Sequence, residues 1–165
     1  MDAVFYAHSK EGAEKEDWQR LEDHLQGVAR LAGSFAESFG SGQWGWLAGL
    51  WHDLGKYQLA FQRRLEGDTQ KVDHSVVGAV HARHSGEQLL ALALVISGHH
   101  GGMPDLSSSE ADGSRPLVER LSAGAPLYQS ARPAMPATVT DISLPQPLAR
   151  LCPATTATWV RTTWA

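Results

Sequence analysis

The stretch WLAGLWHDLGKYQLAFQRRL, residues 46–65, decides the fold class of this chain. Trp51 follows Leu47 by four residues and Ala48 by three, as one buried face of a helix requires, and Gly55 can end that helix. Four-residue spacing follows in Tyr57, Phe61 and Leu65. The stretch therefore predicts two consecutive helices, with a polar pair between them.

Helical spacing recurs on both sides of this stretch. Upstream, apolar residues follow steps of three and four from Trp18 to Phe39, which predicts one long helix that starts at an Asp17 cap and ends at Gly40. Downstream, SVVGAVHARH and EQLLALALVISGHH predict two more helices. Neither segment shows the apolar–polar alternation of a strand together with the turn residues of a hairpin. We therefore expect an all-α helical bundle.

The C-terminal part of the chain has a different character. Seven of the eight prolines lie between Pro116 and Pro153, and proline at this density interrupts helices. Only PLVERLSAGAPLYQSAR contains a plausible helix there. We expect one domain over residues 1–131 and an irregular tail over residues 132–165, as a truncated or altered end of the same domain.

Length, charge and cysteine content limit the classes of function. A chain of 165 residues fits one domain, and its net charge of −4 means that nucleic-acid binding would need a local basic patch or bound metal. The single cysteine, Cys152, excludes an intramolecular disulfide and a thiolate-rich zinc site. The N-terminus lacks a signal-peptide pattern, and no apolar run is long enough for a membrane span. We expect a cytoplasmic protein without membrane contact.

Histidines and one aspartate are placed where they could form a metal site. The candidates are His24, the adjacent pair His52 and Asp53, His74, and the adjacent pair His99 and His100. Imidazole nitrogens with a carboxylate favour Mn, Fe, Co, Ni or Zn over Mg. A lone buried histidine is more often a core residue with a hydrogen-bond partner, so His24 by itself indicates little. A His-Asp pair is also weak evidence until its surroundings are considered.

Five motifs, in the same order, resemble the HD nuclease domain of the CRISPR-associated helicase-nuclease of type I systems. These motifs are YAHS, the helix with Trp18, Leu21 and His24, then LAGLWHDLGKYQLAFQ, VDHSVVGA and GHHGGMPDL, across residues 6–106. The resemblance implies an HD-domain bundle that cuts single-stranded DNA in antiviral defence. It also implies two partners, a helicase domain or subunit and an RNA-guided surveillance complex. The chain shows no GxxxxGK[ST] loop, so we expect the motor to come from that helicase.

The same resemblance implies a role for each motif residue. It assigns one divalent transition metal ion to His24, His52 and Asp53. It assigns a second ion, bridged by Asp53, to His74, His99 and His100. It places Lys56 near the scissile phosphate, as a catalytic group beside Asp53. His8 is expected to pack against or order the N-terminus. His81 and His84 match no motif, and we expect them on a helix surface or without a specific role.

One departure from the family pattern affects the first metal ion. The family provides a further aspartate from a late helix, but Asp141 lies in the proline-rich context TVTDISLP, which does not match. We therefore expect the first metal position to be the weaker one. Arg63, Arg64 and Lys71 could follow the phosphates of a single strand, although a solvated helix face explains these charges equally well.

Two other hypotheses remain open at this stage. An HD-type nucleotide phosphohydrolase would use the same residues but would need a closed pocket for base and sugar. A truncated, non-catalytic HD bundle would fold without efficient metal binding.

Overall fold

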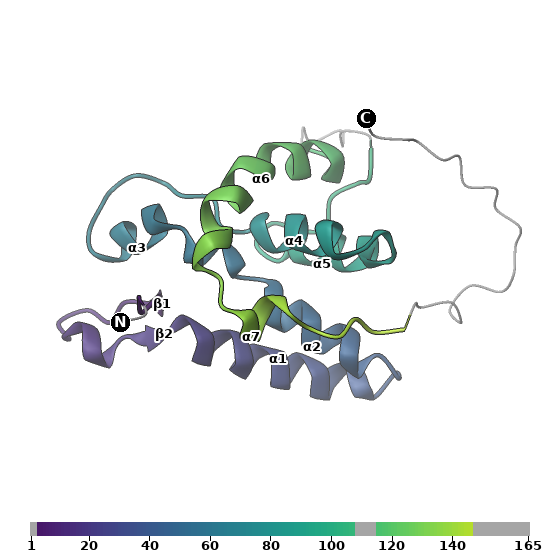
Figure 1. Ribbon diagram of the computed structural model, residues 1–165, viewed down its shortest axis with the longest axis horizontal. Helices are drawn as coiled ribbons and strands as arrows, with labels where there is room; N and C mark the ends of the chain where they lie inside the picture. Colours follow the sequence, from purple (N-terminus) through teal and green to yellow (C-terminus); the bar gives the residue numbers. More distant parts are fainter. Residues whose placement is uncertain (1–2, 108–114, 147–165) are drawn as a thin grey trace, which may run out of the picture.

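A computed structural model describes residues 3–107 and 115–146 of the chain, and α-helices joined by short 3-10 turns dominate these residues (Figure 1). The helices are α1 (Leu21–Glu37), α2 (Gly42–Trp51), α3 (Leu59–Leu65), α4 (Val77–Ser85), α5 (Leu90–Gly98), α6 (Leu117–Ala131) and α7 (Ala137–Thr140). The 3-10 turns are η1 (Lys15–Asp17), η2 (Leu54–Tyr57), η3 (Glu87–Leu89) and η4 (Arg132–Ala134). The predicted all-α class is confirmed.

The strands in the described residues form one small antiparallel sheet near the N-terminus. It pairs β1 (Tyr6–His8) with β2 (Gln19–Arg20). This sheet is too short to form a core of its own, and it lies against the beginning of α1 instead.

Helices α1 and α2 form a tight antiparallel pair, which lies side by side along one edge of the molecule in Figure 1. Their close approach depends on small residues: a Cβ atom on Gly49 would lie only 2.7 Å from the Cα atom of Ala29. Ala29 and Ala36 are buried on the α1 face that meets α2. The pair therefore packs backbone against backbone rather than through large side chains.

The tight pair explains two differences from the predicted first helix. Phe35 and Phe39 were expected on its buried face, but they are 67% and 71% exposed, because the alanine side of α1 faces α2 instead. The helix also begins at Leu21, not after a cap at Asp17, because Gln19 and Arg20 pair with β1.

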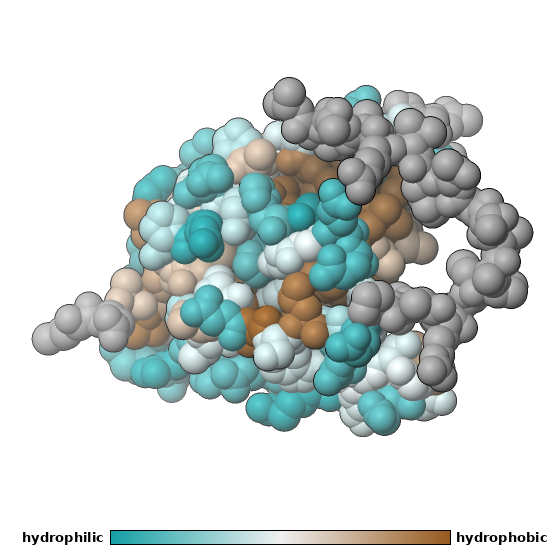
Figure 2. Space-filling view, turned by 45° about the vertical axis from the view of Figure 1, so that its right-hand side comes forward, coloured by the Kyte–Doolittle hydropathy of each residue, from teal (hydrophilic) through white to brown (hydrophobic). Residues whose placement is uncertain are grey.

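Figure 2 shows hydrophobic surface on one face of the molecule as separate areas among hydrophilic residues.

Helices α4, α5 and α6 form the second layer of the bundle (Figure 1). The residues from Val77 to Ala82 in α4 are all buried, because this helix is packed among α2, α5 and α6. The expectation that His81 lies on the surface is therefore wrong. Its ring meets the Trp51 ring edge-on at 4.6 Å, and its Nδ1 atom is 3.3 Å from the Tyr128 hydroxyl. His84 is exposed, as expected, and stacks on Tyr128.

Residues 132–146 pack against this bundle. Met135 and Val139 belong to the core, and the indole nitrogen Nε1 of Trp51 donates a 2.8 Å hydrogen bond to the carbonyl oxygen of Val139. The rest of the predicted tail, residues 147–165 with Cys152, lies outside the described residues, so the boundary at residue 131 stays a prediction. Within the described ranges, no helix has both the length and the apolar character of a membrane span.

Candidate metal centre

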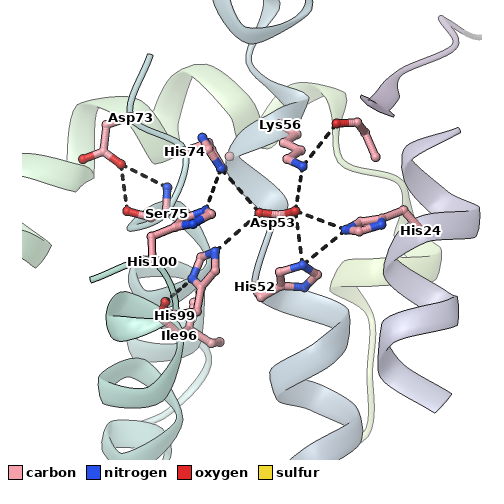
Figure 3. Close-up of polar contacts among 12 residues, drawn as sticks. His24, His52, Asp53, Lys56, Asp73, His74, Ser75, Ile96, His99 and His100 are labelled. Carbon is pink, nitrogen blue, oxygen red and sulfur yellow. Dashed lines mark hydrogen bonds and ion pairs between the residues drawn. The ribbon is translucent and has the colours of Figure 1, made fainter. Parts of the chain in front are cut away.

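The residues proposed as ligands come from five parts of the fold and meet around one carboxylate, that of Asp53 (Figure 3). His24 projects from α1, and His74 comes from the loop before α4. Helix α2 ends at Trp51, so that His52 is its C-cap, and Asp53 is the N-cap of η2. His99 and His100 follow the end of α5. Helix ends and loops thus bring together side chains that are far apart in the sequence.

The first group of donors surrounds the Oδ2 atom of Asp53. The Nε2 atoms of His24 and His52 lie 3.2 and 3.1 Å from this oxygen, and 3.3 Å from each other. Three donor atoms at these separations can contact one ion, because metal–ligand bonds of about 2.0–2.2 Å place neighbouring ligands roughly 3 Å apart.

The second group surrounds the other carboxylate oxygen, Oδ1. The Nε2 atoms of His74 and His99 are each 3.6 Å from this oxygen. His100 completes the group, with its Nε2 atom 3.0 Å from that of His74. The donors within each group lie no more than 4.8 Å from one another. Asp53 thus presents one oxygen to each group, as a bridging ligand would.

Backbone carbonyl groups orient two of these imidazole rings. The Nδ1 atom of His52 is 2.7 Å from the carbonyl oxygen of Gly49, and that of His99 is 2.6 Å from the carbonyl oxygen of Ile96. A carbonyl oxygen only accepts, so each Nδ1 atom must carry the hydrogen, and in the neutral ring the Nε2 lone pair points at Asp53. An imidazole lone pair and a carboxylate oxygen that face each other repel unless a proton or cation lies between them. This arrangement is typical of metal-binding histidines.

The Asp53 carboxylate is 4% exposed, and its Oδ1 atom is buried without a hydrogen-bond partner among the described residues. Burial by itself would raise the pKa of Asp53, but the imidazoles of His24, His52 and His99 beside the carboxylate hold this pKa well below its usual value. Burial also lowers the pKa of His74, which favours its neutral, ligating form. A buried, ionised carboxylate with an unpaired oxygen and imidazole nitrogens around it fits a divalent cation.

Lys56 lies beside the same carboxylate. It is 4% exposed, its Nζ atom is 2.8 Å from the Oδ2 atom of Asp53, and it also donates to the carbonyl oxygen of Ala7 at 3.1 Å. Sequence reasoning expected this ammonium group near a scissile phosphate, and the structure brings it to the metal ligands. No feature of the sequence predicted the hydrogen bond from Lys56 to Ala7 in β1.

Two glutamines that sequence reasoning missed support the centre. Gln58 donates through Nε2 to the carbonyl oxygens of Gly55 and Asp73, and so links η2 to the loop that carries His74. Gln62 donates to the carbonyl oxygens of Lys56 and Tyr6, and so links η2 to β1. The sequence offered one signal for this role: both glutamines follow the His52-Asp53 pair closely, on a stretch with helical spacing.

The remaining polar candidates lie outside both donor groups. His8 is exposed, and its ring meets that of His24 edge-on at 5.1 Å, beside the centre. Asp141 is exposed and lines a separate cavity with His81 and His84. In the part of the chain that the structure describes, the late aspartate therefore does not complete the first group.

A helical bundle with a shared aspartate between two histidine groups defines a candidate metal-dependent hydrolase. Comparison with known families agrees: residues 21–133 match the HD domain. This match covers more than half of the chain, and the chain belongs to the HD domain family. HD domains are typically metal-dependent hydrolases, and the His/Asp cluster could hold divalent metal. No curated protein matched the chain significantly.

Proposed function

We propose that this HD domain is a metal-dependent nuclease that cuts phosphodiester bonds of single-stranded DNA. The observation that carries the proposal is the Asp53 carboxylate, whose two oxygens face two separate sets of imidazole donors. Divalent metal held there would lower the pKa of a water molecule and neutralise charge on a phosphate. The chain's own residues hold and orient those ligands through the carbonyl groups of Gly49 and Ile96.

The openness of the centre supports a polymeric substrate. The side chains of His74 and His99 are 21% and 20% exposed, although Asp53 between them is buried. The following residues, Gly101–Met103, are also exposed. A backbone phosphate of a flexible strand can approach such a site from solvent, whereas a free nucleotide would need walls that enclose its base and sugar.

Positive charge on α3, the helix whose Phe61 ring contacts His74, supports a path for a strand. The ring of Phe61, in α3, contacts that of His74 at 5.0 Å, and the same helix carries Arg63 and Arg64. Both arginines are exposed. Such charges bind phosphates without reading bases, so we expect little sequence preference. Lys71, which is exposed in the loop before His74, would extend this path.

The resemblance to type I CRISPR nucleases extends the proposal to partners and place of action. The domain would act in the cytoplasm on a strand displaced by an RNA-guided surveillance complex, and a helicase domain or subunit would supply it. A pull-down with such a helicase and surveillance complex, followed by cleavage of the displaced strand, tests this part separately.

The test of the nuclease proposal compares three substrates at equal phosphate concentration, with Mn²⁺ present: single-stranded DNA, intact duplex and free nucleotides. We expect cleavage of the single strand, with little action on the duplex and none after chelation. Hydrolysis of nucleotides without DNA cleavage would instead identify a nucleotide phosphohydrolase. A folded chain that neither binds metal nor cuts any substrate would be a non-catalytic bundle.

A further inference from the structure

The two oxygens of Asp53 differ in their surroundings. Oδ2 already accepts from the ammonium group of Lys56 at 2.8 Å, besides facing His24 and His52. Oδ1 is buried without a hydrogen-bond partner among the described residues. The negative charge of the carboxylate is therefore partly neutralised on one side and available on the other.

Lys56 is held firmly in this position. Its side chain is 6% exposed, and its Nζ atom also donates to the carbonyl oxygen of Ala7. Gln62 fixes the surrounding backbone, because it donates to the carbonyl oxygen of Lys56 and both donates to and accepts from the backbone of Tyr6. A swing of Lys56 into solvent would leave a buried carbonyl oxygen without this donor, which is unfavourable.

The donor count adds to this difference in charge. The Oδ2 side offers two imidazoles and an oxygen that already has a cation beside it. The Oδ1 side offers three imidazoles and an oxygen with no hydrogen bond. A second positive charge near an ammonium group is repelled, and this repulsion is strong where burial limits screening by solvent.

We propose that Lys56 limits the resting chain to one tightly bound divalent cation, held on the Oδ1 side by Asp53, His74, His99 and His100. The side with His24 and His52 then binds a second cation only weakly. This inference rests on the metal centre of the proposed function and goes beyond it by stating which half is filled and which residue decides it.

The first experiment measures metal stoichiometry by equilibrium dialysis of the chelator-treated full chain against Mn²⁺. We expect one tight Mn²⁺ ion per chain and a second bound at least about tenfold more weakly. His100→Ala should weaken the tight ion by about tenfold or more, whereas His24→Ala should leave its affinity within about threefold. Loss of the tight ion in His24→Ala, with His100→Ala unaffected, would overturn the proposal.

The second experiment removes the ammonium group. Lys56→Met keeps the length of the side chain, and it should tighten the second Mn²⁺ ion by about tenfold or more, so that two ions bind per chain. Lys10→Met, at an exposed position, is the matched control and should leave both affinities unchanged. Circular dichroism verifies folding, and the comparison of the histidine variants shows which side holds the tight ion independently of Lys56→Met.

The outcomes separate this inference from the proposed function. Two ions of equal affinity in the unmodified chain, or no response to Lys56→Met in the folded state, would refute the role of Lys56 while the nuclease proposal stands. Absence of any Mn²⁺ binding would refute both. Tight binding of one Mn²⁺ ion without DNA cleavage would support the inference and contradict the nuclease.

Discussion

A Cβ atom on Gly55 would lie 2.2 Å from the carbonyl oxygen of His74 and 2.5 Å from its Cα atom. Both neighbours are backbone, so a larger residue at position 55 must push the His74 segment away. We expect Gly55→Ala to lower the free energy of unfolding by about 1–3 kcal/mol. It should also weaken Mn²⁺ binding, because His74 would leave its place opposite Asp53.

Gly27 provides the control for this substitution. It lies in α1, and a Cβ atom there would meet nothing within 4 Å. We expect Gly27→Ala to leave metal binding unchanged and to raise the free energy of unfolding by up to about 1 kcal/mol. Urea unfolding and a Mn²⁺ titration of both variants test the pair. Equal stability and equal Mn²⁺ affinity of the two variants would mean that the close approach of η2 to His74 matters neither for folding nor for metal binding.

Replacement of Asp53 tests the shared ligand. Because both donor groups use this carboxylate, Asp53→Ala should reduce DNA cleavage by more than the roughly 10- to 100-fold that loss of an outer-shell partner costs. Asp141→Ala removes an exposed aspartate outside both groups and should keep normal activity. The measurement is the initial rate on single-stranded DNA with Mn²⁺ present. Near-normal cleavage by Asp53→Ala would rule out this metal centre as the source of activity.

The buried His81 ring should make stability depend on pH. Burial, with help from the charges of Arg132 and His84, lowers the pKa of His81 to about 4 from 6.5. Between these values the unfolded chain binds more protons at this residue, so stability is complete above about pH 6.5 and decreases as pH falls towards 4. The expected loss from this residue is roughly 3 kcal/mol.

The measurement for His81 is the urea midpoint of the unmodified chain and of His81→Gln, from pH 7 to pH 4. The difference between the two curves isolates this residue from the carboxylates, which titrate in both proteins. We expect the variant to lose less stability over this interval. Parallel curves would show that the His81 ring is protonated in the folded state as easily as in the unfolded one.

The hydrogen bond from Trp51 to Val139 connects α2 to α7, and its removal tests that connection. Trp51→Phe leaves the carbonyl oxygen of Val139 without its donor in a buried place, and the smaller ring leaves space in the core. We expect a loss of about 2–4 kcal/mol. Trp44→Phe, which removes an exposed 3.3 Å bond to the carbonyl oxygen of Gln146, should cost clearly less. Thermal unfolding distinguishes the two.

The sequence by itself determined the helical class and the order of the helices. Apolar steps of three and four residues around 46–65 and in the neighbouring segments require helices to bury one face. The family match over residues 21–133 confirms the HD domain that the motifs indicated, and the narrower nuclease resemblance stays a prediction. The sequence also indicated which histidines and which aspartate belong together, because their motifs occur in a recognisable order. Their roles as ligands stay predictions.

Tertiary structure decided what depends on contacts between distant residues. Whether Phe35 faces the core depended on how closely glycine and alanine let α2 approach α1, and the burial of His81 depended on three helices around α4. The partner of Lys56 was equally hidden, because Ala7 is 49 residues away and contributes only a backbone oxygen, which every residue has. Periodicity reports the face of a single helix, whereas packing between elements chooses the neighbours of that face.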